Sequence, residues 1–189
     1  MEKILWKLIQ EFVSLLTFIL FLFLEKIKMN IENKMSDNDF LLRAVKLAEN
    51  GIEKGGGPFG AVIVRNNEII SEATNMVIQS SDPTAHAEIV AIRQASKLLG
   101  SHDLHDCILY SSCEPCPMCL GAIYWSGIKT VFYAADRKDA ASAGFNDKFI
   151  YDEIGLPADE RGIKFCKSHE VDGTTVFRKW DLFENKIPY

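Results

Sequence analysis

The sequence predicts an α/β fold, a sandwich of helices around a central sheet that contains parallel strands. Segments with the two-residue period of strands alternate with segments of helical period, which is the pattern of βαβ units. The 189 residues are 48% hydrophobic and 25% charged, a composition that supports one domain with a substantial core. Because no internal repeat or linker-like stretch interrupts this pattern, we expect a single folded domain beyond the N-terminal segment.

The expected elements begin at residue 37. Apolar residues recur at helical spacing over residues 37–54, and the run GGGPFG ends that helix. Residues 59–75 contain two strand-like runs around Asn66 and Asn67, whose tolerance of positive φ suits a tight hairpin. Beyond the hairpin we expect helices at 80–100, 115–127, 145–155 and 174–187, and strands at 107–113, 130–136 and 163–169.

The first 34 residues form an N-terminal apolar extension, so we divide the chain into residues 1–34 and a domain at 35–189. The most apolar stretch, residues 12–24, is shorter than the roughly 20 residues that a membrane-spanning helix needs. No cleavage site of a signal peptide follows it. The extension is either a membrane or interfacial anchor or the product of an upstream start, and composition does not separate the two.

Charge and cysteine content restrict the function. The formal net charge is −5 and no basic stripe is visible, so we expect a small neutral partner and no nucleic acid. The cysteines are odd in number, five, and three of them lie within residues 113–119, which is a poor layout for disulfides. These features favour a reducing compartment, and we expect a cytoplasmic protein, membrane-associated only if the extension is an anchor.

The strongest motif is a set of potential metal ligands. Cys116 and Cys119 are three residues apart at the start of a predicted helix, which places both thiols on one face. Pro115 suits the first helical position, and the positive helix terminus favours thiolates. His86 starts another predicted helix, so the two helix N-termini can meet at one edge of the sheet. One histidine and two cysteines leave a fourth zinc position open for water, as in catalytic sites.

Glu88 adds an acid–base group to this set. It follows His86 by two residues and therefore points away from it, which suits a proton shuttle between water and substrate. A structural zinc would instead take Cys113 or a second histidine as fourth ligand, and an iron–sulfur cluster would take a fourth cysteine. The pattern H-x-E at 86–88 followed by P-C-x-x-C at 115–119 is typical of zinc deaminases of nucleobases. The other histidines, His102, His105 and His169, are expected to be solvated.

From about Met35 to Tyr189 the chain resembles the bacterial guanine deaminases of the cytidine-deaminase-like fold. The resemblance is carried by the segments GGPFGAVIV, DPTAHAEI, LYSSCEPCPMCLGAIYW, VFYAA and AGFNDKFIY. It implies a three-layer α/β/α fold with a central mixed sheet, and zinc-dependent hydrolysis of guanine to xanthine and ammonia. The first 34 residues have no counterpart in that family's pattern.

The resemblance also implies roles for particular residues. Those that bind zinc or move protons would be His86, Cys116 and Cys119 as ligands, with Glu88 and Asp147 as catalytic groups. Those that bind or enclose the purine would be Asn75, Phe59, Trp125, Tyr189 and the backbone N–H of Ala87, together with Asp147. From the residues alone, Asp147 is equally well a helix-capping acid and Trp125 a core aromatic.

The resemblance further implies a homodimer with exchanged C-terminal segments, in which Tyr189 closes the active site of the neighbouring chain. Three alternatives remain at this point. A tRNA adenosine deaminase or a cytosine deaminase would share the zinc motif, although the acidic balance disfavours the tRNA substrate. A noncatalytic zinc-binding module or membrane-tethered scaffold would have no use for Glu88.

Overall fold

The computed structural model describes residues 2–32 and 34–187, and contacts within the chain divide it into two compact units, Met1–Ser36 and Asp37–Tyr189. The first unit contains one long helix, α1 (Glu2–Glu32). Its described large apolar side chains, Ile4, Trp6 and those from Phe12 to Leu24, are exposed. Among the described residues, no helix combines the length and the apolar character that crossing a bilayer requires.

The second unit is built on a mixed sheet with the strand order β2-β1-β3-β4. β1 pairs antiparallel with both β2 and β3, whereas β3 and β4 run parallel. Asn66 and Asn67 adopt φ values of 53° and 66° between β1 and β2, which confirms the expected tight hairpin. The strand bounds are Gly60–Arg65 for β1, Glu68–Thr74 for β2, Cys107–Cys113 for β3 and Thr130–Ala135 for β4.

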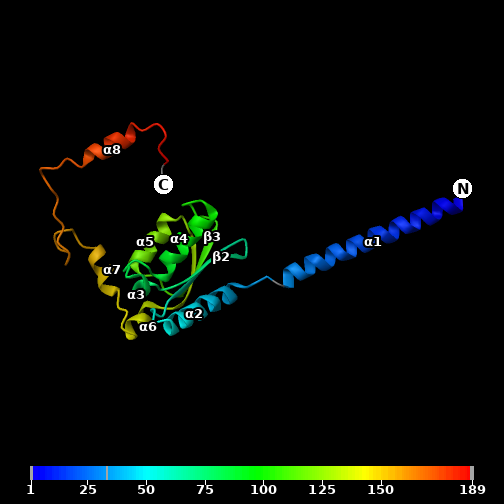
Figure 1. The fold of residues 1–189 in the computed structure, drawn as a ribbon, viewed down its shortest axis with the longest axis horizontal. Coiled ribbons are helices and arrows are strands. Elements are labelled where there is room, and N and C mark those ends of the chain that lie inside the picture. Colours follow the sequence, from blue (N-terminus) through cyan, green and yellow to red (C-terminus); the bar gives the residue numbers. More distant parts are fainter. Residues whose placement is uncertain (1, 33, 188–189) are drawn as a thin grey trace. The chain divides into compact units, whose positions relative to one another are not determined.

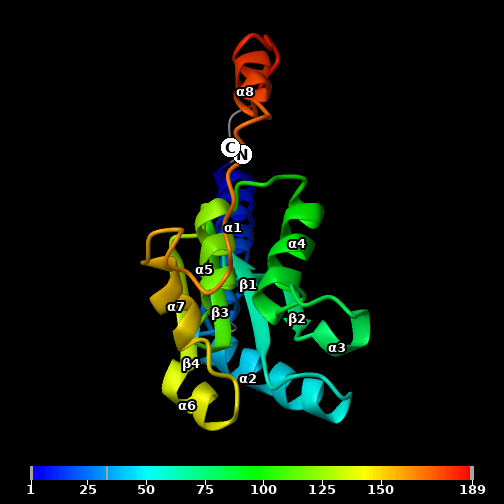
Figure 2. The same ribbon diagram turned by 90° about the vertical axis from the view of Figure 1, so that its left-hand side faces the viewer.

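Helices cover both faces of this sheet (Figures 1 and 2). α2 packs on one face, where Phe40 contacts a core that includes Val62 of β1 and Tyr110 of β3. α4 and α5 pack on the opposite face, in a core that includes Ile63 and Leu109. Alternate residues of each strand therefore enter different cores, and the expected three-layer α/β/α arrangement is confirmed. The bounds are Asp37–Glu53 for α2, Ala87–Leu99 for α4 and Pro117–Trp125 for α5.

The helix predicted at residues 80–100 begins later than expected. α4 starts at Ala87, because Asp82 folds the preceding residues into a turn. Its Oδ1 accepts hydrogen bonds from the backbone N–H of Thr84 at 2.8 Å and from the Thr84 hydroxyl at 2.7 Å. Two short helices were not predicted, α3 (Val77–Ser80) and α6 (Arg137–Ser142), whereas α7 (Lys148–Ile154) lies within the expected residues 145–155.

The C-terminal prediction is partly wrong. Residues 163–169 form no strand, because no described strand lies beside them to pair with their N–H and C=O groups. The last helix, α8 (Thr174–Asp181), is shorter than the expected 174–187. Every residue from Gly162 to Ile187 is exposed.

Gly60, at the start of β1, allows α2 to lie close to the sheet. A Cβ atom there would lie 2.3 Å from the carbonyl oxygen of Ala44 and 2.7 Å from the backbone nitrogen of Ala48. Because backbone atoms cannot move without shifting the helix, we expect Gly60→Ala to lower the free energy of unfolding by about 1–3 kcal/mol. Denaturant unfolding of the full chain measures this. Gly121→Ala is the matched control, because a Cβ there meets no atom within 4 Å, and equal midpoints for the two variants would contradict the prediction.

Candidate active site

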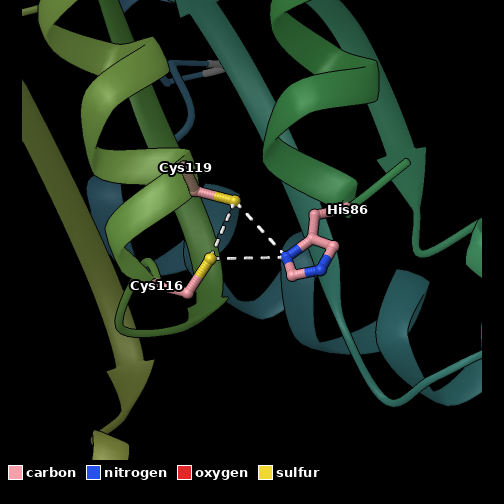
Figure 3. A group of neighbouring side chains, drawn as sticks. All are labelled: His86, Cys116 and Cys119. Carbon is pink, nitrogen blue, oxygen red and sulfur yellow. Dashed lines mark hydrogen bonds between the residues drawn. The ribbon is translucent and has the colours of Figure 1, made fainter. Parts of the chain in front are cut away.

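Two helix N-termini bring one histidine and two cysteines together. His86 is the N-cap of α4 and Cys116 is the N-cap of α5, with Cys119 one turn further along. Cys116 Sγ, Cys119 Sγ and His86 Nδ1 are each 3.5 Å from the other two atoms (Figure 3). The expectation that Pro115 opens this helix is wrong, because Pro117 occupies its first position and Pro115 precedes the N-cap.

The spacing of these atoms fits a zinc ion. With tetrahedral bonds of about 2.0–2.3 Å, neighbouring ligand atoms lie about 3.3–3.8 Å apart, and the observed separations are 3.5 Å. The hydrogen bond between the two thiols lowers the pKa of Cys116 to about 4 and raises the pKa of Cys119. Because zinc binds thiolates, the three residues form a prearranged site with three protein ligands.

Glu88 lies beside the three ligands and is only 4% exposed. Its Oε1 accepts a hydrogen bond from Ser111 Oγ at 3.0 Å, and its Oε2 lies 3.5 Å from Cys119 Sγ. Burial raises the pKa of Glu88 above its ordinary value. A carboxyl group with a raised pKa is suited to take up and release a proton near neutral pH.

His86, Cys116 and Glu88 face a cavity of about 590 Å³. The rings of Phe59 and Phe145 line it and meet edge to face, with centroids 5.0 Å apart. Their aromatic surface suits a flat heterocycle. The cavity is also lined by Gly55, Gly56, Gly57, Asn75, Glu114, Arg137, Asn146 and Asp147.

Asn75 and Asp147 offer complementary hydrogen-bonding groups in this cavity. Asn75 is buried, and its Oδ1 accepts from the Val77 N–H at 3.2 Å, which leaves the amide N–H groups for a ligand. Asp147 precedes α7 but makes no side-chain capping bond. Asn146 instead accepts from the Lys148 N–H at 3.0 Å. The helix-capping alternative for Asp147 therefore does not hold, and burial together with the Cys116 thiolate raises its pKa.

Comparison with known proteins agrees with this geometry. Residues 34–135 match the zinc-binding region of cytidine and deoxycytidylate deaminases. The chain belongs to this family of zinc deaminases. It is 57% identical over 156 residues to a guanine deaminase of Bacillus subtilis (strain 168), covering 82% of this chain and 100% of that protein. The predicted fold and the zinc site at His86, Cys116 and Cys119 are confirmed.

Two solved structures and a further relative add detail to the family assignment. An X-ray structure of guanine deaminase from Bacillus subtilis has a TM-score of 0.80 and covers 82% of this chain and 99% of that chain. A structure of guanine deaminase from Nitrosomonas europaea is 32% identical, with a TM-score of 0.56, and covers 59% of this chain and 65% of that one. A tRNA-specific adenosine deaminase of Aquifex aeolicus is 46% identical over 105 residues, which are 55% of this chain and 70% of that protein.

In this member of the deaminase family, Trp125 lies apart from the cavity that the zinc ligands face. It is 71% exposed and lines a second groove, together with Arg93 and His102. The reason is helical geometry, because Trp125 follows Cys116 by nine residues and therefore lies about half a turn around the helix from it. Trp125 is thus not among the residues that line the zinc cavity of its own chain, and its contact with the purine stays a prediction.

Two other predicted purine contacts remain predictions. Ala87 is the first residue of α4, where the backbone N–H has no acceptor within the helix, and the residue is fully buried. Tyr189 lies outside the described residues. Cys113 is no ligand, since its thiol donates to the Asp136 carbonyl at 3.6 Å and burial raises its pKa to about 11. Within the described chain, the remaining histidines, His102, His105 and His169, also lie outside the zinc group.

Sequence reasoning missed several residues of the deaminase site. Ser111 could have been found from the two-residue period of β3, which puts it on the same face as Leu109 and Cys113. Phe145 stands in the segment AGFNDKFIY, two residues before Asp147, and could have been singled out there. No sequence signal joins the cavity-lining pair Glu114 and Arg137, because 23 residues separate them and only the tertiary structure brings them into contact.

Proposed function

We propose that this chain hydrolyses guanine to xanthine and ammonia. The observation that carries the proposal is the cavity itself, which joins a three-ligand zinc site and the buried Glu88 to groups that suit a purine. These groups are the rings of Phe59 and Phe145 and the carboxylate of Asp147, which makes no capping bond to α7. The similarity to a guanine deaminase along the whole length of that protein supports the same substrate.

Residues of this chain account for the proton transfers. Zinc, when bound by His86, Cys116 and Cys119, supplies a Lewis acid that makes water nucleophilic at neutral pH. Glu88 takes a proton from the water that attacks C2 of guanine and returns it to the departing amino group. The C–N bond breaks, ammonia leaves and the carbonyl of xanthine remains. Ser111 holds one oxygen of Glu88 and leaves the other near the zinc ligands.

The remaining cavity residues recognise the base. The N–H groups of Asn75 can donate to ring acceptors of the purine, and the carboxylate of Asp147 can accept from its N–H groups. Phe59 and Phe145 pack against the ring and exclude water. A base without matching N–H groups would leave a partly buried carboxylate unpaired, which disfavours its binding.

An ammonia-release assay of the zinc-loaded full chain tests the proposal. Its panel contains guanine, adenine, cytosine, their nucleosides and tRNA. We expect guanine to be preferred over every other substrate. Equal rates for cytosine and guanine, or a preference for tRNA, would overturn the proposal and favour one of the related activities.

A homodimer with exchanged C-terminal segments is part of the same proposal. In the described chain β4 pairs only with β3, so its outer edge offers backbone groups to another chain. The exposed residues from Gly162 to Ile187 carry apolar side chains that water solvates poorly, among them Ile163, Phe165, Val176, Phe177 and Leu182. A second copy of the chain is a partner that can cover both features at once.

Deletion of residues 187–189 tests the exchange. We expect the truncated chain to keep its zinc and its fold while activity falls, because the site loses its cover and substrate positioning. The truncated chain is then refolded together with full-length Glu88→Gln, which is inactive but has a complete tail. Activity should reappear in the mixture, since only a mixed dimer combines an intact Glu88 with a donated tail. Verified mixed dimers that stay inactive would show that each tail serves its own chain.

A further inference from the structure

The segment that carries Asp147 is fixed against the zinc-binding loop at both of its ends. Residues 143–147 connect α6 to α7 and line the cavity through Phe145 and its neighbours. The residues just before the zinc ligand Cys116 are Glu114 and Pro115. Residues of α6 and α7, the helices on either side of residues 143–147, contact Glu114 and Pro115.

The first contact fixes the start of α6. One carboxylate oxygen of Glu114 lies 3.1 Å from Arg137 Nε, and the other accepts the backbone N–H of Arg137 at 3.3 Å. The backbone N–H of Glu114 in turn donates to the Ala135 carbonyl at 2.9 Å. A single side chain on the zinc-binding loop therefore holds both the guanidinium and the backbone of the first residue of α6.

The second contact fixes α7. The guanidinium of Arg137 lies over the ring of Tyr151, with 4.5 Å from Cζ to the ring centroid. The hydroxyl of Tyr151 donates to the Pro115 carbonyl at 3.1 Å. These contacts form a closed ring, which we call the brace and which consists of Glu114, Arg137, Tyr151 and Pro115. Arg137 is the residue of the brace that links α6 to α7.

The exposure of the brace argues against a role in overall stability. The side chains of Arg137 and Glu114 are 45% and 25% exposed, and ion pairs with such access to water contribute little to folding. The brace can instead set the position of the Asp147 segment. Both Arg137 and Glu114 line the cavity, and the brace joins that segment to the loop that holds Cys116. Small displacements of a reacting or binding group have large effects on rate.

We propose that Arg137 is a positioning residue, which with Glu114 and Tyr151 holds Asp147 at a set distance from the zinc ligands. This inference rests on the proposed guanine deaminase function for its kinetic test. Arg137 touches no reacting atom on this account. Its effect on catalysis passes through the placement of residues 143–147.

The kinetic test compares Arg137→Gln with a matched control. Arg43 and Glu72 form an ion pair of almost the same exposure, 43% and 26%, and neither residue lines the cavity. We expect Arg137→Gln to lower kcat/KM for guanine by about 10- to 100-fold, whereas Arg43→Gln changes it by less than about twofold. Arg137→Lys should recover part of the loss, because it keeps the charge but not the planar fork. Equal effects of Arg137→Gln and Arg43→Gln would overturn the inference.

A double-mutant cycle separates positioning from a general loss of structure. If Arg137 acts through Asp147, then Arg137→Gln should cost little further activity in an Asp147→Asn background, whereas a merely structural role would give additive losses. A wild-type chain that does not deaminate guanine would refute the proposed function instead. In that case hydrogen exchange of residues 143–147 decides the matter. Faster exchange in Arg137→Gln than in Arg43→Gln supports the brace, and unchanged exchange overturns it.

Discussion

Replacement of Glu88 by glutamine is expected to lower kcat for guanine by about 10²- to 10⁴-fold, while the chain retains one zinc. Glutamine has the same shape and can keep a hydrogen bond to Ser111, but it cannot carry a proton between water and the leaving amino group. Zinc binding should persist, because the ligands are His86, Cys116 and Cys119. Steady-state kinetics and metal analysis of the same preparation measure both quantities.

The control for this variant is Glu49→Gln, which removes an exposed carboxylate of α2 and should leave kcat unchanged. A Glu88→Gln chain without zinc would show that Glu88 helps to hold the metal. A zinc-loaded variant with wild-type activity would show that another group moves the proton. Either result would overturn the assignment of Glu88 as the proton shuttle.

Replacement of Asp147 by alanine is expected to lower kcat/KM for guanine by about 10²-fold or more, with little change in the unfolding midpoint. The carboxylate makes no capping bond to α7, and Asn146 keeps its own bond to the Lys148 N–H in the variant. In the proposed function, the carboxylate accepts from the N–H groups of the purine and carries a proton near the zinc ligands, and its loss removes both. Guanine kinetics and thermal unfolding of the full chain test the two parts of this expectation.

Asp152→Ala provides the comparison on the same helix, because Asp152 is exposed and pairs only with the solvated Lys148 in the hydrogen bonds and ion pairs of the described chain. We expect it to leave guanine turnover unchanged. If Asp147→Ala instead lowers the unfolding midpoint and retains its turnover, then Asp147 is a structural residue and the purine is recognised by other groups.

The zinc site was predictable because each of its parts is local in the sequence. Cys116 and Cys119 are adjacent on a helix by their spacing alone, and Glu88 is placed by its separation from His86. The hairpin at Asn66 was predictable for the same reason, since a two-residue turn depends on the φ preferences of its own residues. The alternation of strands and helices likewise predicted the three layers of the fold.

The residues that shape the cavity were less accessible to such reasoning. The sequence did not reveal that the angle of Trp125 around α5 places it at a groove other than the zinc cavity. Glu114 meets Arg137 only because β3 and β4 run side by side and bring their ends together. The strand predicted at residues 163–169 shows the same limit, because a strand also requires a neighbour and none of the described strands pairs with this segment.

The sequence by itself thus determined the zinc ligands, the place of Glu88 close to them and the layer order, all of which follow from spacings shorter than one element or from the order of elements. Only the tertiary structure decided that His86 Nδ1 and the two thiols lie 3.5 Å apart. It also decided that Asp147, which lines the same cavity, makes no capping hydrogen bond to α7. The physical reason is the range of the interactions. Helix and turn preferences act between near neighbours in the chain, whereas the cavity is lined by residues such as Glu114 and Arg137, which packing brings together across 23 residues.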